Sequence, residues 1–343
     1  MAACYRALHA RAGVRLSVYS FRLGQTHEDY EDEVAADLPW QFLTRDQWQV
    51  QEHLASILQR EKPDAVFLPG WSYRACNGLL RNGAFSSIKF VMGSDQPWWG
   101  AWRQRLNALR VRRVLRRVDR FVVPGERGWQ CIRNLGVPES KIHRGAQYGV
   151  DDTAWRPLWE QRTNRPDGWP RQFLYVGRFV SEKALDLMLD AHGRYRSRHA
   201  DAWPLSCCGQ GPMADLVEAA PDVRNHGFVQ PAEMPAVFAA HGVLINAARY
   251  DPWPLVIVEA CASGMPVIAS EACGSVVEVV RPYHNGLTVP TGDTDALARA
   301  MSWAHEHHER LPQMGLNGQT LAAAFSAEAW ADRWEQMLAE LAE

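Results

Sequence analysis

Several absences narrow what this chain of 343 residues can be. It has no run of about 18 apolar residues, so no transmembrane helix is predicted, and its start, MAACYRALHARAGVRLSVYS, lacks the unbroken apolar centre of a signal peptide. A net charge of −2 gives no overall electrostatic attraction to nucleic acid or to membranes. The seven cysteines include no CxxC pair, so reduced, mostly buried thiols of a cytoplasmic protein are expected.

What the chain does have is a repeated alternation of short β-branched runs with helical patterns, which is typical of α/β proteins with parallel sheets. A stretch rich in Pro, Gly and Trp, 151–171, interrupts the alternation and is interpreted as a linker. We therefore predict one α/β domain over residues 1–150 and a second over 172–325. The last segment, 326–343, is predicted to be an amphipathic helix that packs back toward the first domain.

Two basic residues follow the first predicted strand of the second domain. Arg178 comes directly after Gly177, where that strand ends, and Lys183 lies near the start of the next helix. In open parallel sheets ligands bind beyond the carboxyl ends of the strands, and helix N-termini attract anions. The pair predicts a diphosphate site, although surface cations without a special role would give the same pattern.

A glycine-rich turn follows the next predicted strand. Gly209, Gly211 and Ala214 fit the pattern G-x-G-x-x-[GA], which suggests a dinucleotide site. However, the acidic residue about 20 positions further on, Glu233, falls within a predicted helix, and the motif is not on the first strand of the domain. A turn that lets another kind of nucleotide approach the backbone is favoured.

Two carboxylates stand among apolar residues in YDPWPLVIVEACASGMPVIAS, residues 250–270. Asp251 lies in a predicted strand-to-helix loop and Glu259 within the helix, whose first free N–H groups belong to Leu255 and Val256. This arrangement suits a polyhydroxyl ligand that carries phosphate. The alternative is that Asp251 only caps the helix and that Glu259 is half exposed.

Five segments of the second domain resemble, in order, those of the family 4 retaining glycosyltransferases. They are VGRFVSEKALDLMLDA, CCGQGPMADLV, NHGFVQPAEMPAVFAAHGVLINA, YDPWPLVIVEACASGMPVIASEACGSVVEVV and NGLTVPTGDTDALARAM. The first domain is similar more loosely, through DRFVVPGERGWQCIRNLGVPESKI and YGVD. The resemblance implies the GT-B fold, two Rossmann-like parallel-sheet lobes that face each other across a cleft. It also implies transfer of a sugar from a nucleotide-diphospho-sugar to an acceptor hydroxyl on a carbohydrate or lipid-linked molecule.

The same resemblance assigns roles to individual residues. Arg178 and Lys183 match the basic pair that holds the donor diphosphate. Asp251 and Glu259 match the two acids of the family's E-x7-E motif, which bind the transferred sugar and the donor ribose. Asp95 falls near the position of a catalytic histidine in many members. The remaining donor contacts are expected at Gly177, Gly209, Gly211, Val229, Trp253, Leu255 and Val256. No metal or other cofactor is implied.

The sequence departs from the family pattern at three places. The first motif acid is Asp251 rather than glutamate, and Trp253-Pro254 replaces the commoner Phe-Gly, so sugar preference is expected to differ. The family's first strand and its glycine-rich loop are not seen, so either the start is truncated or that element is missing.

One basic segment carries a second hypothesis. Residues 102–120 hold eight arginines and one acid, and an apolar stripe is predicted at Leu106, Leu109, Val114, Leu115 and Val118. This predicts either an ordinary solvated helix face or contact with an anionic membrane surface or a lipid-phosphate acceptor. A cytoplasmic protein is expected, and the second interpretation would place it at the inner membrane face.

Three other functions remain open. The first is an NAD-dependent oxidoreductase that uses Gly209 and Gly211. The second is a sugar-nucleotide epimerase or phosphorylase on the same fold, and the third is a nucleotide-sugar binding protein without catalysis. The sequence DTD at 293–295 resembles a metal-binding motif, but helix capping explains it because a predicted helix follows directly.

Overall fold

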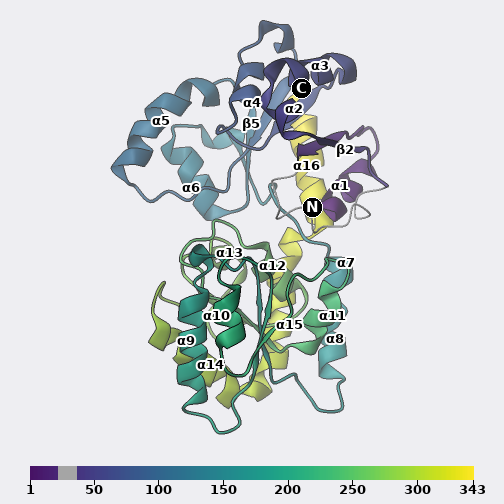
Figure 1. Cartoon of the computed structure of the whole chain (residues 1–343). Helices are drawn as coiled ribbons and strands as arrows, with labels where there is room; N and C mark the ends of the chain where they lie inside the picture. The colour runs from purple at the N-terminus through teal and green to yellow at the C-terminus, as the bar shows by residue number, and fades with distance from the viewer. Residues whose placement is uncertain (22–36) are drawn as a thin grey trace. The chain divides into compact units, whose positions relative to one another are not determined.

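The computed structural model describes residues 1–21 and 37–343 and divides them into two compact units (Figure 1). Unit 1 comprises Met1–Gly149 and Ala327–Glu343, and unit 2 comprises Val150–Ser326. Unit 1 is therefore built from two separated segments of the chain, whereas unit 2 is continuous.

A six-stranded parallel sheet forms the centre of unit 2, in the order β12-β11-β10-β7-β8-β9. The strands are β7 (Phe173–Val176), β8 (Leu205–Cys208), β9 (Val223–Asn225), β10 (Val243–Asn246), β11 (Val267–Ser270) and β12 (Gly286–Val289). Every residue of β8, β10 and β11 is buried, as expected where helices cover both faces of a parallel sheet. The direction of strand addition reverses between β7 and β10. This is the switch point of a doubly wound sheet, where ligands bind.

Helices surround this sheet. They are α9 (Leu185–Arg196), α10 (Ala214–Ala219), α11 (Met234–Ala240), α12 (Leu255–Ala262), α13 (Val276–Val279), α14 (Thr294–Glu306) and α15 (Leu311–Ala322), with a 3-10 turn η5 (Ser181–Lys183) before α9. α9 and α14 pack together, and their buried residues join those of the strands in one apolar core. At the start of α14, the Asp293 carboxylate accepts a hydrogen bond from Ala296 N at 2.8 Å, so this aspartate caps the helix.

The segment 151–171, expected to be a linker, belongs to unit 2 and contains two short helices, α7 (Asp152–Trp155) and α8 (Leu158–Thr163). The Trp155 ring packs on Phe238 with ring centroids 4.7 Å apart. The Pro, Gly and Trp content suggested irregular structure because helices of four to six residues leave no periodic pattern, and only burial shows that they are part of the core.

The described residues of unit 1 form two parallel sheets, one of four strands in the order β3-β4-β5-β6 and one of two strands, β1-β2. The strands are β1 (Val18–Phe21), β2 (Trp40–Leu43), β3 (Ala65–Leu68), β4 (Lys89–Gly93), β5 (Arg120–Val123) and β6 (Ile142–Arg144). The helices are α1 (Ala2–His9), α2 (Arg45–Gln49), α3 (Gln51–Glu61), α4 (Arg74–Leu79), α5 (Trp102–Leu115), α6 (Glu126–Asn134) and α16 (Ala327–Ala342), with 3-10 turns η3 (Gly83–Phe85) and η4 (Glu139–Lys141).

The C-terminal helix α16 completes the interior of unit 1. Its apolar side packs with α1 and with the sheet residues Val91 and Val122. The Trp334 indole N–H donates to the carbonyl oxygen of Ala146 at 2.6 Å, which fixes the helix to the end of the four-stranded sheet. Across residues 1–21 and 37–343, no helix has the length and apolar character needed to cross a membrane.

Candidate functional site

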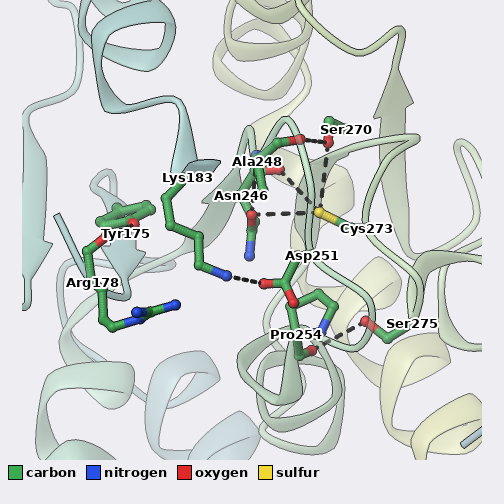
Figure 2. A network of polar contacts seen from close by, with 10 residues as sticks. All are labelled: Tyr175, Arg178, Lys183, Asn246, Ala248, Asp251, Pro254, Ser270, Cys273 and Ser275. Atoms are coloured by element: carbon green, nitrogen blue, oxygen red, sulfur yellow. Dashed lines mark hydrogen bonds and ion pairs between the residues drawn. The ribbon is translucent and has the colours of Figure 1, made fainter. Parts of the chain in front are cut away.

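The switch point of unit 2 brings a lysine and an aspartate together. Lys183 ends η5, beyond β7, and Asp251 lies in the loop beyond β10. The Lys183 Nζ donates to the Asp251 carboxylate at 2.5 Å (Figure 2), and the two side chains are only 17% and 11% exposed. Because neighbouring loops of a doubly wound sheet diverge at this point, a buried ion pair here marks the place where a ligand is expected.

The backbone holds the two loops against each other. Arg249 N and Tyr250 N both donate to the carbonyl oxygen of Glu182, at 2.8 and 3.3 Å. The Arg249 guanidinium adds contacts to the Ser181 carbonyl oxygen at 2.9 Å and to the Asp186 carboxylate at 2.6 Å. The loop that carries Asp251 is therefore tied to the turn that carries Lys183 on both sides of the ion pair.

A third loop, beyond β11, supports Asp251 from the opposite side. Asp251 pairs with Cys273 as an isolated parallel bridge, and Gly274 N donates to the Asp251 carbonyl oxygen at 2.9 Å. A Cβ atom on Gly274 would lie 1.7 Å from the Pro252 carbonyl oxygen, so only glycine fits there. The Ser275 hydroxyl donates to the Pro254 carbonyl oxygen at 3.1 Å (Figure 2).

The loop then runs into α12, whose first turn offers unused donors. Leu255 N and Val256 N make no hydrogen bond to any described residue, and no side chain caps this helix. Exposed N–H groups at a helix start attract anions. One turn further along, the partly buried Glu259 carboxyl forms no ion pair with a described residue, and burial raises its pKa to about 7.

Arg178 extends the positive charge of the site. Its side chain is exposed, and Figure 2 shows its guanidinium on the same side of the site as the Lys183 ammonium. The Tyr175 hydroxyl donates to the Arg178 carbonyl oxygen at 2.9 Å, and Gly177 N donates to the Cys208 carbonyl oxygen at 3.0 Å. These bonds fix the backbone and leave the Arg178 side chain free to meet an anion.

The glycine-rich turn has a packing role. A Cβ on Gly209 would lie 1.9 Å from the Gly177 carbonyl oxygen, and one on Gly211 would lie 2.6 Å from the Phe179 carbonyl oxygen. Phe179 N donates to the Gln210 carbonyl oxygen at 2.8 Å. The two glycines therefore let the loops beyond β7 and β8 pack backbone against backbone, which explains the motif without a dinucleotide.

Comparison with known proteins identifies the family. The profile described as "Glycosyl transferases group 1" matches residues 170–307, and that described as "Glycosyltransferase Family 4" matches residues 3–144. The lipopolysaccharide core biosynthesis glycosyltransferase LpsE of Rhizobium meliloti is 30% identical over 304 residues, which cover 84% of this chain and 78% of LpsE. This chain belongs to the family 4 glycosyltransferases.

Other relatives in this group differ in length or only share the fold. A GDP-mannose-dependent alpha-mannosyltransferase of Mycobacterium tuberculosis is 31% identical over 236 residues, and the chain spans 56% of its length. The structure of Anabaena HepE in complex with UDP superposes with a TM-score of 0.75 at 16% identity, covering 99% of this chain and 96% of HepE. The Thermosynechococcus elongatus sucrose-phosphate synthase gives 0.76 at 20% identity, covering 98% and 91%. The predicted GT-B fold is confirmed.

Two of the residues expected from the family pattern have other surroundings. The Trp253 side chain is only 8% exposed and packs on Phe325 with ring centroids 5.5 Å apart, so its indole belongs to the interior of unit 2. Only the backbone of Trp253 remains available to contact a donor. Val229 lies in the loop beyond β9 and is partly buried. This loop contacts the glycine-rich turn, because Gly209 N donates to the Gly227 carbonyl oxygen at 2.7 Å.

Asp95 belongs to unit 1 and follows β4. The Tyr148 hydroxyl donates to the Asp95 carboxylate at 3.1 Å. Burial, and then the negative charge of Asp95, raise the pKa of the Tyr148 hydroxyl above its ordinary value. The aspartate is thus held by a neutral phenol in a partly buried position.

Sequence reasoning gave no role to Arg249 and Asp186, which fix the loops of this candidate site. Arg249 contacts Ser181 and Asp186, which lie 68 and 63 positions away in sequence, so no local motif marks the contact. The one available signal for Arg249 was its place directly before the Tyr-Asp pair, beyond a buried strand. In the part of the chain that the structure describes, no group of three His, Cys, Asp or Glu side chains is arranged to hold a metal ion.

Proposed function

We propose that this protein is a retaining glycosyltransferase that moves a sugar from a nucleotide-diphospho-sugar to an acceptor hydroxyl. The observation that carries the proposal is the Lys183–Asp251 pair at the switch point of unit 2, beside the free N–H groups of Leu255 and Val256. A cation and a helix start suit a diphosphate, and two carboxylates within eight positions suit sugar and ribose hydroxyls.

In the proposed complex the Lys183–Asp251 ion pair separates, and the two side chains bind different parts of the donor. We infer that the diphosphate binds Lys183, Arg178 and the N–H groups at the start of α12. The Asp251 carboxylate, relieved of its lysine, then accepts a hydroxyl of the transferred sugar. Glu259, with its pKa near 7, accepts the ribose hydroxyls. Each charge that the site buries before binding finds a new partner in the complex.

The proposed chemistry is a same-face substitution. The bond between the anomeric carbon and the leaving phosphate oxygen breaks as the acceptor oxygen forms a new bond to that carbon. The acceptor proton passes to the departing phosphate oxygen, so atoms and charge balance without a protein nucleophile. Arg178 and Lys183 stabilise the negative charge that develops on the diphosphate, which lowers the barrier to leaving-group departure. We propose that no metal ion is required for this step.

The names of similar proteins suggest the kind of substrate. The relatives above include a GDP-mannose-dependent enzyme and a lipopolysaccharide core enzyme, and HepE was solved with UDP. We therefore infer a GDP- or UDP-sugar donor and an acceptor in polysaccharide, glycolipid or other glycoconjugate biosynthesis. We also propose a cytoplasmic protein that associates peripherally with a membrane.

A donor screen tests the proposal. UDP-, GDP- and ADP-sugars, and separately NADH, are added to the protein in the presence of either EDTA or added Mg²⁺, and the midpoint of thermal unfolding is recorded. We expect one donor class to raise the midpoint by several degrees whether or not EDTA is present. A shift that appears only with added divalent metal would contradict metal independence. A shift with NADH and none with any sugar nucleotide would favour the oxidoreductase.

The catalytic roles need a second measurement. The double variant Arg178→Ala/Lys183→Ala is compared with Arg165→Ala/Lys89→Ala, which removes two exposed cations elsewhere. We expect the first to lower kcat/KM by about 10²-fold or more and the second to leave it unchanged. Wild-type turnover by the Arg178→Ala/Lys183→Ala variant would overturn the assignment.

Product analysis tests the reaction type. NMR of the product shows whether the anomeric configuration is retained, and epimerised sugar from donor alone would show an epimerase. Donor binding without transfer to any acceptor would show a binding protein.

A further inference from the structure

Helix α5 has two apolar sides, where the sequence predicts one stripe. Val114, Leu115 and the following Val118 are at most 8% exposed and belong to the core of unit 1. Leu106 and Leu109 point away from that core and are 51% and 68% exposed. The predicted stripe is therefore wrong as a single surface, because its first two members and its last three face different directions.

The outer side of α5 is apolar along its centre. Trp102 is 66% exposed and lies on the same side as the two leucines, since positions i, i+4 and i+7 share one side of a helix. We call Trp102, Leu106 and Leu109 the α5 stripe. Figure 1 shows α5 at the periphery of unit 1, away from α1 and α16. An ordinary solvated helix has polar residues at the centre of its exposed side, so this surface needs another explanation.

Arginines border the α5 stripe. At 100° per residue, Arg105 and Arg112 lie on one side of it and Arg110 on the other, while Arg113 continues its line. Within the part of the chain that the structure describes, none of these four guanidinium groups forms an ion pair with a carboxylate. The α5 helix itself contains no acidic residue. The surface therefore combines exposed apolar area with uncompensated positive charge.

A cavity of about 280 Å³ adjoins the C-terminal end of the α5 stripe. It lies between α5 and the segment that follows α6. Three cationic residues line it, Arg112, Arg116 and Lys141, and both arginines are exposed. Its apolar lining is Leu115, Leu135, Val137 and Pro138. The Lys141 Nζ donates to the Val118 carbonyl oxygen at 2.9 Å, which holds this cation in place. The volume exceeds that of several water molecules, enough for one phosphate group.

We propose that the α5 stripe and its bordering arginines dock the protein on an anionic lipid surface, with one lipid phosphate in the cavity beside Arg112 and Arg116. At a bilayer surface the indole lies among the headgroups, the leucines reach the acyl chains and the guanidinium groups meet lipid phosphates. A nucleic acid would meet the charge but leave the leucines in water. A second copy of the chain would bring arginines against arginines. The inference rests on the proposed peripheral association and does not depend on sugar transfer.

Vesicle binding by the full chain tests the docking surface. The protein is sedimented with vesicles of phosphatidylcholine alone and of phosphatidylcholine mixed with phosphatidylglycerol. We expect at least roughly 10-fold tighter binding to the anionic vesicles, weakened by added salt. Equal binding to both vesicles, or binding to neither, would overturn the proposal. So would binding to soluble polyglutamate as tight as to the anionic vesicles, because that would mark a protein or nucleic-acid partner.

Two pairs of variants separate the apolar and charged contributions. Leu106→Ser/Leu109→Ser is matched with Leu216→Ser/Leu316→Ser, which changes two exposed leucines of unit 2. Arg112→Gln/Arg116→Gln is matched with Arg45→Gln/Arg165→Gln. We expect each α5 variant to lose roughly 10-fold or more in affinity for anionic vesicles and each control to keep wild-type affinity. Unchanged binding in both α5 variants contradicts the assignment.

The thermal shift induced by the donor is recorded for the same variants. An unchanged shift together with lost vesicle binding supports docking through α5. If wild type does not prefer anionic vesicles but shows a normal donor-induced thermal shift, the docking proposal is wrong and the proposed transfer is unaffected. If wild type shows no donor-induced thermal shift, only the proposed function is contradicted.

Discussion

Asp251, which the sequence comparison matched to the first acid of the family's E-x7-E motif, is one methylene shorter than glutamate, and its surroundings favour the shorter side chain. The carboxylate contacts Lys183 at 2.5 Å, and the residue is 8% exposed. Backbone bonds fix the loop on both sides, so little room remains for relaxation. The aspartate side chain therefore has the length that reaches Lys183 from this fixed loop.

We predict that Asp251→Glu, although it restores the commoner family residue, will impair the protein. The added methylene must displace Lys183 or strain the loop, and overpacking of this kind costs about 1–3 kcal/mol. We expect kcat/KM for donor transfer to fall roughly 10-fold. Asp190→Glu, on the exposed side of α9, serves as the control. Equal or higher kcat/KM in Asp251→Glu would show that the Lys183 contact does not constrain the acid.

Glu259 gives a prediction about pH. Burial raises its pKa from the ordinary 4.5 to about 7 in the folded chain. Between these values the folded state holds a proton that the unfolded state has released, so the free energy of unfolding falls as pH rises. Above about pH 7 both states are ionised and the loss is complete, on the order of 3 kcal/mol.

The measurement compares wild type with Glu259→Gln in urea, from about pH 5 to about pH 8. The glutamine variant does not titrate, so wild type should lose stability relative to it as pH rises through this window. A difference that stays constant from pH 5 to pH 8 would mean that Glu259 is well solvated.

The sequence indicated the chemistry of these residues but not their partners. Lys183 and Asp251 were predicted because each follows a buried strand, and the alternating pattern of a parallel sheet shows where strands end. That the two side chains bond to each other depends on the order of strands in the sheet, which no local pattern records. The glycines at 209 and 211 were interpreted through a ligand, whereas a Cβ atom on either of them would first meet a backbone carbonyl oxygen.

At the scale of elements, α12 depends on a buried arginine at its C-terminal end. Arg162, from α8, is fully buried and donates to the carbonyl oxygens of Ser263 and Gly264, at 2.7 and 3.1 Å, and of Phe238 at 3.2 Å. Burial lowers its pKa to about 9, so it remains charged at neutral pH. The guanidinium satisfies the carbonyl groups of Ser263 and Gly264, directly after the helix that begins at the proposed donor site, and that of Phe238 in α11.

We predict that Arg162→Met will destabilise unit 2 by about 3 kcal/mol, because three buried carbonyl groups lose their donor. Thermal unfolding of the full chain measures the effect. Arg165→Met, an exposed change three residues further on, should stay within about 0.5 kcal/mol of wild type. If both variants unfold at the wild-type temperature, water replaces the guanidinium and the arginine is not structural.

Elements were predictable where they are long or wholly apolar. The buried runs of β8, β10 and β11 were clear, and so was the one-sided pattern of α16. The strands β2, β6 and β12 were not found. They are about as short as the strands that were found, but none of them is buried along its whole length, so they lack the continuous apolar character of a central parallel strand. α7 and α8, with four and six residues, are likewise too short to show a helical period, which is why residues 151–171 were predicted to be a linker.

At the scale of the whole molecule, the C-terminal segment belongs to unit 1, so the stability of unit 1 should depend on it and that of unit 2 should not. Unit 1 uses 327–343, and the buried side chains of α16 face apolar residues of α1 and of the sheet. Unit 2 is continuous and has its own core. It also holds every residue proposed to bind the donor, so donor binding should not require an intact unit 1.

We therefore predict that a chain ending at Ser326 will lose unit 1 but keep unit 2. Removing Trp330, Trp334, Met337 and Leu341 takes away four buried apolar side chains, roughly 8 kcal/mol at about 2 kcal/mol each, which is comparable to the whole stability of a domain. Limited proteolysis should degrade residues 1–149 and leave a resistant fragment near 150–326, and the donor should still raise its thermal midpoint. A chain ending at Leu341, which lacks only two exposed residues, should resist as wild type does. If unit 1 of the chain that ends at Ser326 resisted proteolysis, α16 would only cover a core that is already stable without it.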